Sequence, residues 1–206
     1  IMARLAHDPS ILKIARPEVV DISTLLTMNG NLEKIQKSLE SFLDDKRRNF
    51  PRFYFLSNDD LLDILGNSKE PKLVQPHLRK CFEGIYKVVF QEKPGWVPPP
   101  PPEGETEHSK PPLPPVLITN MCASTGETVQ LHEPVDPEAF DNQVERWLTK
   151  TEQMMIATLR DLMTKAMDDF VKTKNRNDFI PRWPGQVSTV VSSIQWTTVL
   201  ENAIVN

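Results

Sequence analysis

The densest grouping of side chains able to do chemistry is His132, Glu133 and Asp136, which in principle could form an acid–base set or hold a metal ion. Two prolines, Pro134 and Pro137, are interspersed with them, and prolines at this spacing favour a turn. None of the other three histidines has neighbouring ligands at metal spacing either. We therefore interpret the group as turn residues and expect no catalytic or metal site.

Two pairs of adjacent carboxylates, Asp44-Asp45 and Asp59-Asp60, could also suggest acid–base chemistry. Each pair is better explained by the helix on which it is expected. The first is typical of a solvated helix face. The second follows Ser57, whose hydroxyl can cap a helix at the backbone N–H of Asp60, so that both carboxylates lie at the positive end of the helix dipole.

Nucleotide-binding and hydrolase motifs are absent from the sequence. The chain contains no Gly-Lys dipeptide, which a P-loop requires, and its seven glycines are too scattered for a dinucleotide-binding loop. Neither G-x-S-x-G nor H-E-x-x-H occurs. We expect a segment that is not an enzyme and that holds no cofactor.

Composition is ordinary for a globular protein, with 39% hydrophobic and 25% charged residues in a chain of 206. A formal charge of −4 argues against a nucleic-acid surface, and no apolar run approaches the roughly 20 residues of a membrane span. The two cysteines, Cys81 and Cys122, are expected to be reduced structural thiols rather than a disulfide. The start at Ile1 and the end inside an apparent helix suggest a piece of a longer polypeptide.

The first half of the chain reads as helices separated by an aromatic connector. Apolar residues at intervals of three and four predict a helix from a cap at Asn31 to about Arg48, with one face that needs a partner. Pro51 should stop that helix, and the following aromatic residues favour an extended strand. The helix expected after Ser57 ends at Gly66-Asn67. The apolar face of the first helix consists of Leu32, Ile35, Leu39, Phe42 and Leu43.

A second helix with Pro71 in its first turn is predicted to end at Gly84, and a strand is predicted over residues 85–90. Residues 116–122 and 128–131 flank a turn sequence, so a hairpin there can supply partner strands. Residues 93–115 contain ten prolines and little apolar content, which predicts a polyproline or disordered loop. Its PxxP spacing leaves open a second hypothesis, a stand-alone helical adaptor that binds SH3 or WW domains.

In the second half of the chain, the apolar spacing predicts a helix from Pro137 to about Lys174 and a last helix from Gln186. Between them, residues 179–184 are predicted to form a proline-stiffened aromatic connector. We expect a mainly α fold, an elongated helical bundle with a small antiparallel sheet or hairpin. The domains expected are 1–92, a helical part with the connector 50–56; 93–115, the proline-rich loop; and 116–206, a β-hairpin followed by a long helix and a C-terminal helix. The inner side of the last helix is predicted to be Val187, Val190, Ile194, Thr197 and Leu200.

Several runs of the sequence closely resemble the linker region of dynein heavy chains, especially of the axonemal type. The runs are 50–62, 74–85, 121–131, 183–187 and 194–196, and together the resemblance spans nearly all of residues 30–206. It implies the central part of a linker that arches over a ring of ATPase modules and changes shape to drive movement along microtubules. The ATPase residues of the family belong to ring modules downstream, so none is carried onto this chain.

The resemblance also implies partners and a location. The AAA+ ring modules of the same heavy chain would be contacted directly, and other dynein subunits and microtubules through the whole motor, with no nucleic acid and no membrane. The expected location is the cytoplasm and cytoskeleton, in the axoneme of a cilium or flagellum. Short stiff segments between rods are candidates for hinges or contacts within the motor. The candidate residues are Pro51, Arg52, Phe53, Tyr54, Trp183, Pro184 and Trp196.

For three of these residues a purely structural role competes with the mechanical one. Arg52 could pair with a carboxylate elsewhere in the motor, but a local ion pair is the favoured alternative. Trp183 and Trp196 could mark a hinge or a ring-facing surface, but packing between helices is the favoured alternative.

Overall fold

A computed structural model describes residues 6, 22–97, 114–141, 143–173 and 175–205. The proline-rich prediction for 93–115 therefore falls mostly on residues outside the described part. The chain divides into two compact units, residues 1–48 and residues 49–206. The described secondary structure is mainly helical with one three-stranded antiparallel sheet, which confirms the predicted fold class.

The described part of the first unit is a helix, α3 (Ile22–Asn49), whose last residue belongs to the second unit. It begins nine residues before the predicted cap at Asn31 and continues through Gly30. The correction has a physical reason: the apolar spacing already starts at Leu25, and the helix-forming context outweighs the roughly 1 kcal/mol cost of an internal glycine. Three basic residues close the helix and complement its dipole: Lys46, Arg47 and Arg48.

The aromatic connector is not the strand that its composition predicts. Residues Pro51–Phe55 form a 3-10 turn, η1, with hydrogen bonds from Phe53 N to Phe50 O (3.0 Å) and from Leu56 N to Phe53 O (3.1 Å). Three residues per turn place Phe50 and Phe53 on the same side, where their rings meet edge to face at 4.9 Å. Burying this pair outweighs the strand preference of single aromatic residues.

Two short helices follow, α4 (Asn58–Gly66) and α5 (Pro71–Cys81). The Ser57 hydroxyl accepts a hydrogen bond from the N–H of Asp60 (3.2 Å), so the predicted cap is confirmed. The predicted stop at Gly84 is wrong, because Phe82 already has an extended backbone and caps the helix with its N–H on Leu78 O.

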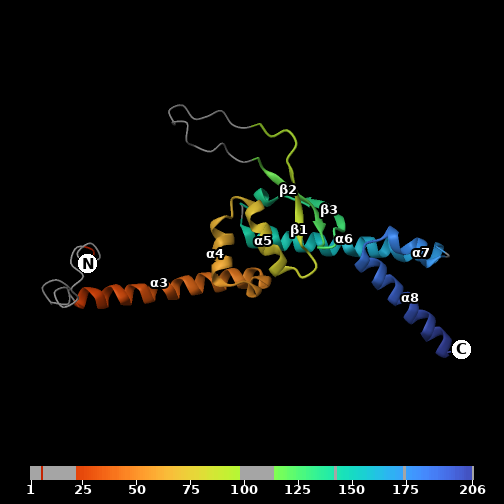
Figure 1. Cartoon of the computed structure of the whole chain (residues 1–206), viewed down its shortest axis with the longest axis horizontal. Helices are drawn as coiled ribbons and strands as arrows, with labels where there is room; N and C mark the ends of the chain where they lie inside the picture. Colours follow the sequence, from red (N-terminus) through yellow and green to blue (C-terminus); the bar gives the residue numbers. More distant parts are fainter. Residues whose placement is uncertain (1–5, 7–21, 98–113, 142, 174, 206) are drawn as a thin grey trace. The chain divides into compact units, whose positions relative to one another are not determined.

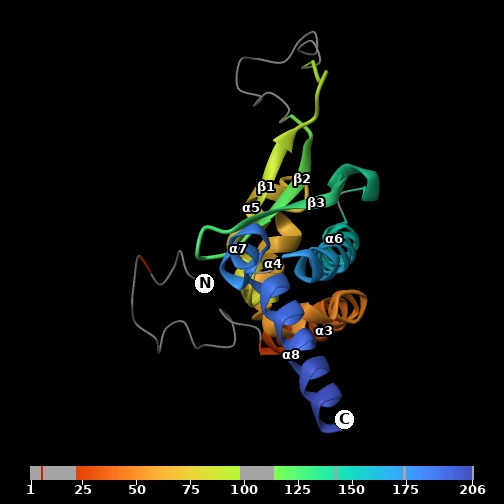
Figure 2. The same ribbon diagram turned by 90° about the vertical axis from the view of Figure 1, so that its right-hand side faces the viewer.

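The sheet consists of β1 (Lys87–Glu92), β2 (Val116–Cys122) and β3 (Thr128–Val135), side by side in that order (Figure 2). Strand β1 pairs Lys87 with Cys122, and Cys122 also faces Thr128 on β3. The predicted hairpin is confirmed, although β3 runs four residues further than 128–131. Its turn needs Gly126, whose φ of +91° lies in the left-handed region that glycine tolerates best.

A 3-10 turn, η2 (Pro137–Phe140), precedes the longest helix, α6 (Val144–Lys172). The predicted start at Pro137 is therefore seven residues too early. The break has a local cause: Asp141 adopts a left-handed conformation with φ of +53°, so the helical hydrogen-bond ladder cannot run through it.

The chain ends in α7 (Arg176–Phe179), η3 (Ile180–Arg182) and α8 (Gly185–Val205). Strand β3 lies along α6, and the first half of α8 packs on α6 before the helix diverges from it (Figure 1). The buried cluster between these helices contains Ala166, Phe179, Val187 and Val191. The predicted inner face of α8 is wrong at Val190, Thr197 and Leu200, which are exposed, and the last two lie beyond the first turns that pack on α6.

Candidate functional site

The residues that first suggested chemistry take structural roles. His132 and Glu133 are exposed residues of β3 rather than turn residues. Asp136 forms an ion pair with the Lys93 ammonium at 2.6 Å, and Glu138 contacts the same ammonium at 3.0 Å. The Asp136 carboxylate is the main reason that the pKa of Lys93 is raised. Within the described residues no group of three or more His, Cys, Asp or Glu could hold a metal ion.

Asp60 joins α4 to α5. Its carboxylate accepts from the Ser57 hydroxyl (2.8 Å) and the Lys80 ammonium (2.7 Å), and it lies 3.4 Å from His77 Nδ1. The other ring nitrogen of His77 lies 2.9 Å from Asp63. The hydrogen bonds from Lys80 and Ser57 lower the pKa of Asp60 to about 2. The carboxylate is thus committed to fastening two helices.

Both cysteines are free and buried, as the sequence predicts. Burial raises the pKa of the Cys81 thiol to about 11, against an opposing effect of the nearby Arg52 charge. A thiol that stays protonated is a poor nucleophile. The burial and the raised pKa of Cys81 fit a packing role.

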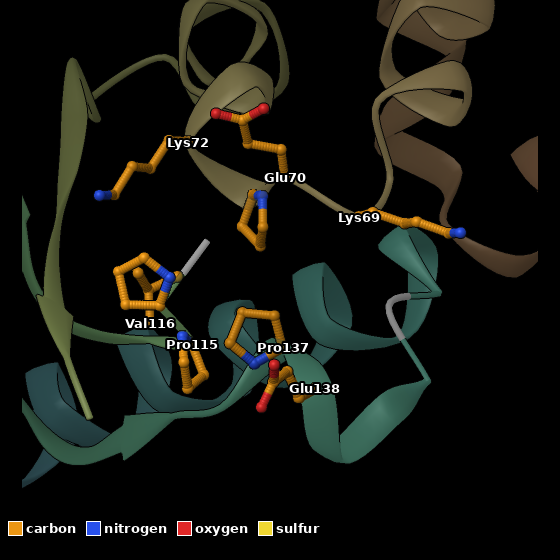
Figure 3. Close-up of a pocket in the computed structure, with 9 residues that line it drawn as sticks. Lys69, Glu70, Lys72, Pro115, Val116, Pro137 and Glu138 are labelled. Atoms are coloured by element: carbon orange, nitrogen blue, oxygen red, sulfur yellow. The ribbon is translucent and has the colours of Figure 1, made fainter. Parts of the chain in front are cut away.

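A small pocket of about 100 Å³ lies where the starts of α5, β2 and η2 meet (Figure 3). Its walls combine prolines with side chains of both charge signs, and no histidine, cysteine or serine lines it. The lining residues therefore include no hydroxyl, thiol or imidazole nucleophile. They are Lys69, Glu70, Pro71, Lys72, Pro114, Pro115, Val116, Pro137 and Glu138.

The first candidate connector, residues 50–56, is fastened to α6 by Arg52. Its guanidinium contacts Glu152 through Nη2 (2.8 Å) and Nε (2.9 Å). Nη1 donates to the carbonyl of Cys81 at the end of α5 (3.0 Å), and the planar group stacks on the Phe82 ring at 4.7 Å. One side chain thus joins η1, α5 and α6, which matches the local ion pair that the sequence favoured.

Other residues of this connector divide between core and surface. Phe53 is fully buried, and the Phe50 ring stands between it and Phe82. Tyr54 and Phe55 point outward, with 61% and 72% of their surfaces exposed. Pro51 occupies the first position of η1, where its fixed φ suits the turn. The connector therefore has one anchored side and one free aromatic side.

The second candidate connector, residues 179–184, is fastened to α6 by Asp169. The Trp183 indole N–H donates to this carboxylate at 2.9 Å, and the Arg182 guanidinium approaches it at 3.4 Å. The hydrogen bond from Trp183 is the main reason that the pKa of Asp169 lies below its usual value. Phe179 packs edge to face on Phe170 of the same helix, with ring centroids 5.0 Å apart.

The hairpin turn holds the beginning of α8. The Glu127 carboxylate accepts a hydrogen bond from the backbone N–H of Gly185 at 2.7 Å. This N–H is one of the unpaired donors at a helix N-terminus, where a carboxylate is also favoured by the helix dipole. Pro184 precedes it, and its carbonyl accepts from Ser188 N at 2.9 Å. The connector is therefore fixed at both ends.

Trp196 does not join this assembly. It lies on the far half of α8 with 61% of its surface exposed, so the predicted packing between helices is wrong for Trp196 within the described residues. Trp183 does pack between helices, against the α6–α8 cluster.

Three residues that complete the connectors, Glu127, Glu152 and Asp169, were not singled out from sequence. Arg52 and Glu152 are 100 positions apart, and Glu127 and Gly185 are 58 apart. An indole N–H usually finds an acceptor when it is covered, as that of Trp183 does in Asp169, but the rule does not identify the acceptor, and the buried Trp147 N–H has none among the described residues.

None of the described helices combines the length and the apolar character that crossing a membrane requires.

Comparison with known proteins finds a match over residues 1–166 to the family model described as dynein heavy chain, N-terminal region 2. Human dynein axonemal heavy chain 3 is 38% identical over 99% of this chain, and human dynein axonemal heavy chain 2 is 40% identical over 96%. Mouse dynein axonemal heavy chain 12 is 36% identical over 99%. The chain spans only 4% to 6% of the length of these relatives.

Proposed function

Because this chain belongs to the dynein heavy-chain family, we propose that it is a mechanical segment of the motor's linker, which passes shape changes of the ATPase ring on to movement along microtubules. The observation that carries the proposal is the fastening of both connectors to one helix. Arg52 and Trp183 each bind a single carboxylate of α6, Glu152 and Asp169. Polar contacts of this kind can exchange partners more readily than a closed apolar core can be repacked.

Such a segment performs no chemistry of its own, and we propose that it needs no cofactor. Its direct partners are the AAA+ ring modules of the same heavy chain. Other dynein subunits and microtubules are engaged through the whole motor. Relatives named as axonemal heavy chains support a place in the cytoskeleton of an axoneme.

The test uses the intact motor with Pro51→Ala and Pro184→Ala, which free the backbone at the two connectors. We expect microtubule gliding velocity to fall while basal ATP turnover stays close to that of the unaltered motor. Pro134→Ala, at an exposed position of β3, is the matched control and should change neither. A proportional loss of velocity and turnover in the connector variants would contradict the mechanical role.

A further inference from the structure

Two small pockets adjoin where the first turn of α8 meets α6 and the β2–β3 hairpin. The larger has a volume of about 240 Å³ and lies between α6 and α8. The smaller, of about 100 Å³, lies between the hairpin and the same two helices. Leu159 and Gln186 line both pockets, so the two cavities share a wall.

Apolar side chains make up most of the lining, and some of them face solvent. In the larger pocket Ile156 is 46% exposed and Val190 is 37% exposed, whereas Val187 belongs to the buried cluster beneath them. The smaller pocket is lined chiefly by Ile85, Met121 and Val129. Exposed apolar side chains that gather around cavities, rather than being scattered singly, mark a binding surface.

The sizes of the pockets indicate what can fill them. Sites for drug-sized molecules usually measure about 300–1,000 Å³, and each of these pockets is smaller. Two neighbouring pockets of this size suit two large apolar side chains from one polypeptide segment. Anchors of this kind, each seated in its own pocket, supply most of the binding energy at protein interfaces.

One positive charge stands unused at this surface. Arg160 is the charged residue of the larger pocket, and its exposed guanidinium is paired with no carboxylate of the described residues. Glu127 lines the smaller pocket, but its carboxylate already binds the N–H of Gly185. The complementary group on a partner is therefore a carboxylate, which a guanidinium can bind through two N–H groups at once.

Gln186 supplies a polar group at the wall between the pockets. Its side chain is exposed, and among the described residues its amide has no hydrogen-bond partner. A side-chain amide offers two donors and one acceptor oxygen. It can therefore bind the backbone of a segment that lies across both pockets and fix its position.

The charge at Arg160 also bears on where the segment comes from. A charge at the edge of a binding surface speeds the encounter with a freely diffusing partner and excludes partners of the wrong charge. A segment tethered within the same polypeptide needs no such steering, because its effective concentration is already millimolar. The surface is therefore suited to a separate polypeptide.

We propose that these two pockets dock a segment of a separate polypeptide that carries two large apolar side chains and a carboxylate, with the carboxylate bound to Arg160. One apolar side chain enters each pocket, and Gln186 binds the backbone between them. The inference does not rest on the proposed mechanical role. It adds a direct contact with another protein to the contacts proposed for the whole motor.

The first test selects binders from a library of random twelve-residue peptides displayed on phage. The 206-residue chain is the target, and the Arg160→Glu variant removes peptides that bind elsewhere. Because Arg160 is exposed, this variant should keep the fold. We expect the enriched peptides to share two large apolar residues and an aspartate or glutamate.

Fluorescence anisotropy then measures the affinity of an enriched peptide for each variant. We expect Arg160→Glu to weaken binding tenfold or more, and Lys165→Glu, the matched charge reversal elsewhere on α6, to change it less than twofold. A peptide with lysine in place of its acidic residue should bind Arg160→Glu at least tenfold better than the original peptide does. Enriched peptides without the shared pattern, or failure of this charge exchange, would overturn the proposal.

The second test uses the assembled motor. The photoreactive residue p-benzoylphenylalanine is placed in the full heavy chain at Ile156 or at Gln186. The control position is Lys165, about two and a half turns beyond Ile156 and hence on the opposite side of α6. After irradiation we expect both pocket positions to be joined to one peptide of a separate subunit that has the selected pattern, and Lys165 not to give this product.

Mixing isotope-labelled with unlabelled heavy chains identifies products formed between two copies. A product within the heavy chain, a product between two copies, or no product from either pocket position would overturn the proposal. Motility is read in neither test, so failure here is distinct from failure of the mechanical role.

Discussion

Arg52 shows how much can depend on one side chain. A guanidinium presents five donors in a planar fork, so it can bind Glu152 through two nitrogens, reach the Cys81 carbonyl and still stack on Phe82. A lysine ammonium in the same place has no plane to stack and no fork. The contact is therefore specific to arginine and not merely to positive charge.

We expect Arg52→Lys to lower the free energy of unfolding by about 1–2 kcal/mol, since partial exposure screens the ion pair but the carbonyl contact and the stacking are also lost. Urea unfolding of the 206-residue chain measures the change. Arg160→Lys, at an exposed position of α6, is the matched control and should fall within about 0.5 kcal/mol of the unaltered chain. Arg52→Lys and Glu152→Gln should also be non-additive in a double-mutant cycle, and additive effects would show that the pair is not coupled.

Asp60 predicts a dependence of stability on acid. Its pKa is about 2 in the folded chain and near 3.8 when unperturbed, so the folded state favours the ionised form. The resulting stability is fully present above about pH 5 and is lost progressively as the pH falls from about 5 to about 1. Asp60→Asn should be less stable at pH 7 and should lose less stability across that interval. Parallel pH profiles for the two chains, measured by thermal unfolding, would count against this assignment.

At the residue scale, what could be predicted depended on distance along the chain. The Ser57 cap lies three residues from the Asp60 N–H that donates to it, and it was evident from the sequence. A local partner for Arg52 was the favoured alternative, but Glu152 could not be identified because nothing local marks a residue 100 positions away.

The helices and strands could also be predicted where nearby residues determine them, and the errors lie at their boundaries. The apolar periodicity of α6 predicted its interior, yet its start depends on the left-handed conformation of Asp141, a residue type that tolerates that conformation without requiring it. Composition predicted a strand at η1, but the pairing of Phe50 with Phe53 favours a 3-10 turn. At η1, therefore, packing outweighs local propensity.

The contact between the hairpin and α8 gives a prediction about a single element. Glu127→Gln keeps an acceptor for Gly185 N but removes the charge at the helix N-terminus, whereas Glu127→Ala removes both. We expect the free energy of unfolding to fall by about 0.5 kcal/mol for Gln and by about 1 kcal/mol for Ala. The change should be detected first as faster amide exchange in the opening turn of α8. Glu133→Ala on exposed β3 is the control. If amide exchange in the opening turn of α8 rose equally in Glu133→Ala, the contact of Glu127 with Gly185 would not be what stabilises that turn.

At the scale of the whole molecule, the mainly α fold with a small sheet was predictable because periodicity and turn signals are local. The arrangement of those elements around α6 was not, since it depends on long-range pairs. The proline-rich stretch could be recognised from composition alone, and residues 98–113 lie outside the described part.

Replacing residues 98–113 by a Gly-Ser sequence of equal length tests what this stretch contributes. Strands β1 and β2 keep their pairing partners and the closing loop keeps its length, so we expect the melting temperature to change by less than about 2 °C. The alternative hypothesis, an SH3- or WW-binding adaptor, predicts that such a domain binds the original chain and not the replaced one. A large fall in melting temperature would instead show that the stretch packs on the sheet.

Helix α6 connects the two fastening points with a defined geometry. Between Glu152 and Asp169 the helix rises by about 25 Å and winds through roughly 4.7 turns. The two carboxylates therefore leave the axis in directions roughly 100° apart. A pull applied at Arg52 and resisted at Trp183 acts on the helix off its axis and in two different planes, so it exerts a torque as well as a tension. If the segment has the proposed mechanical function, α6 transmits a twisting force as well as a pulling force between the two connectors.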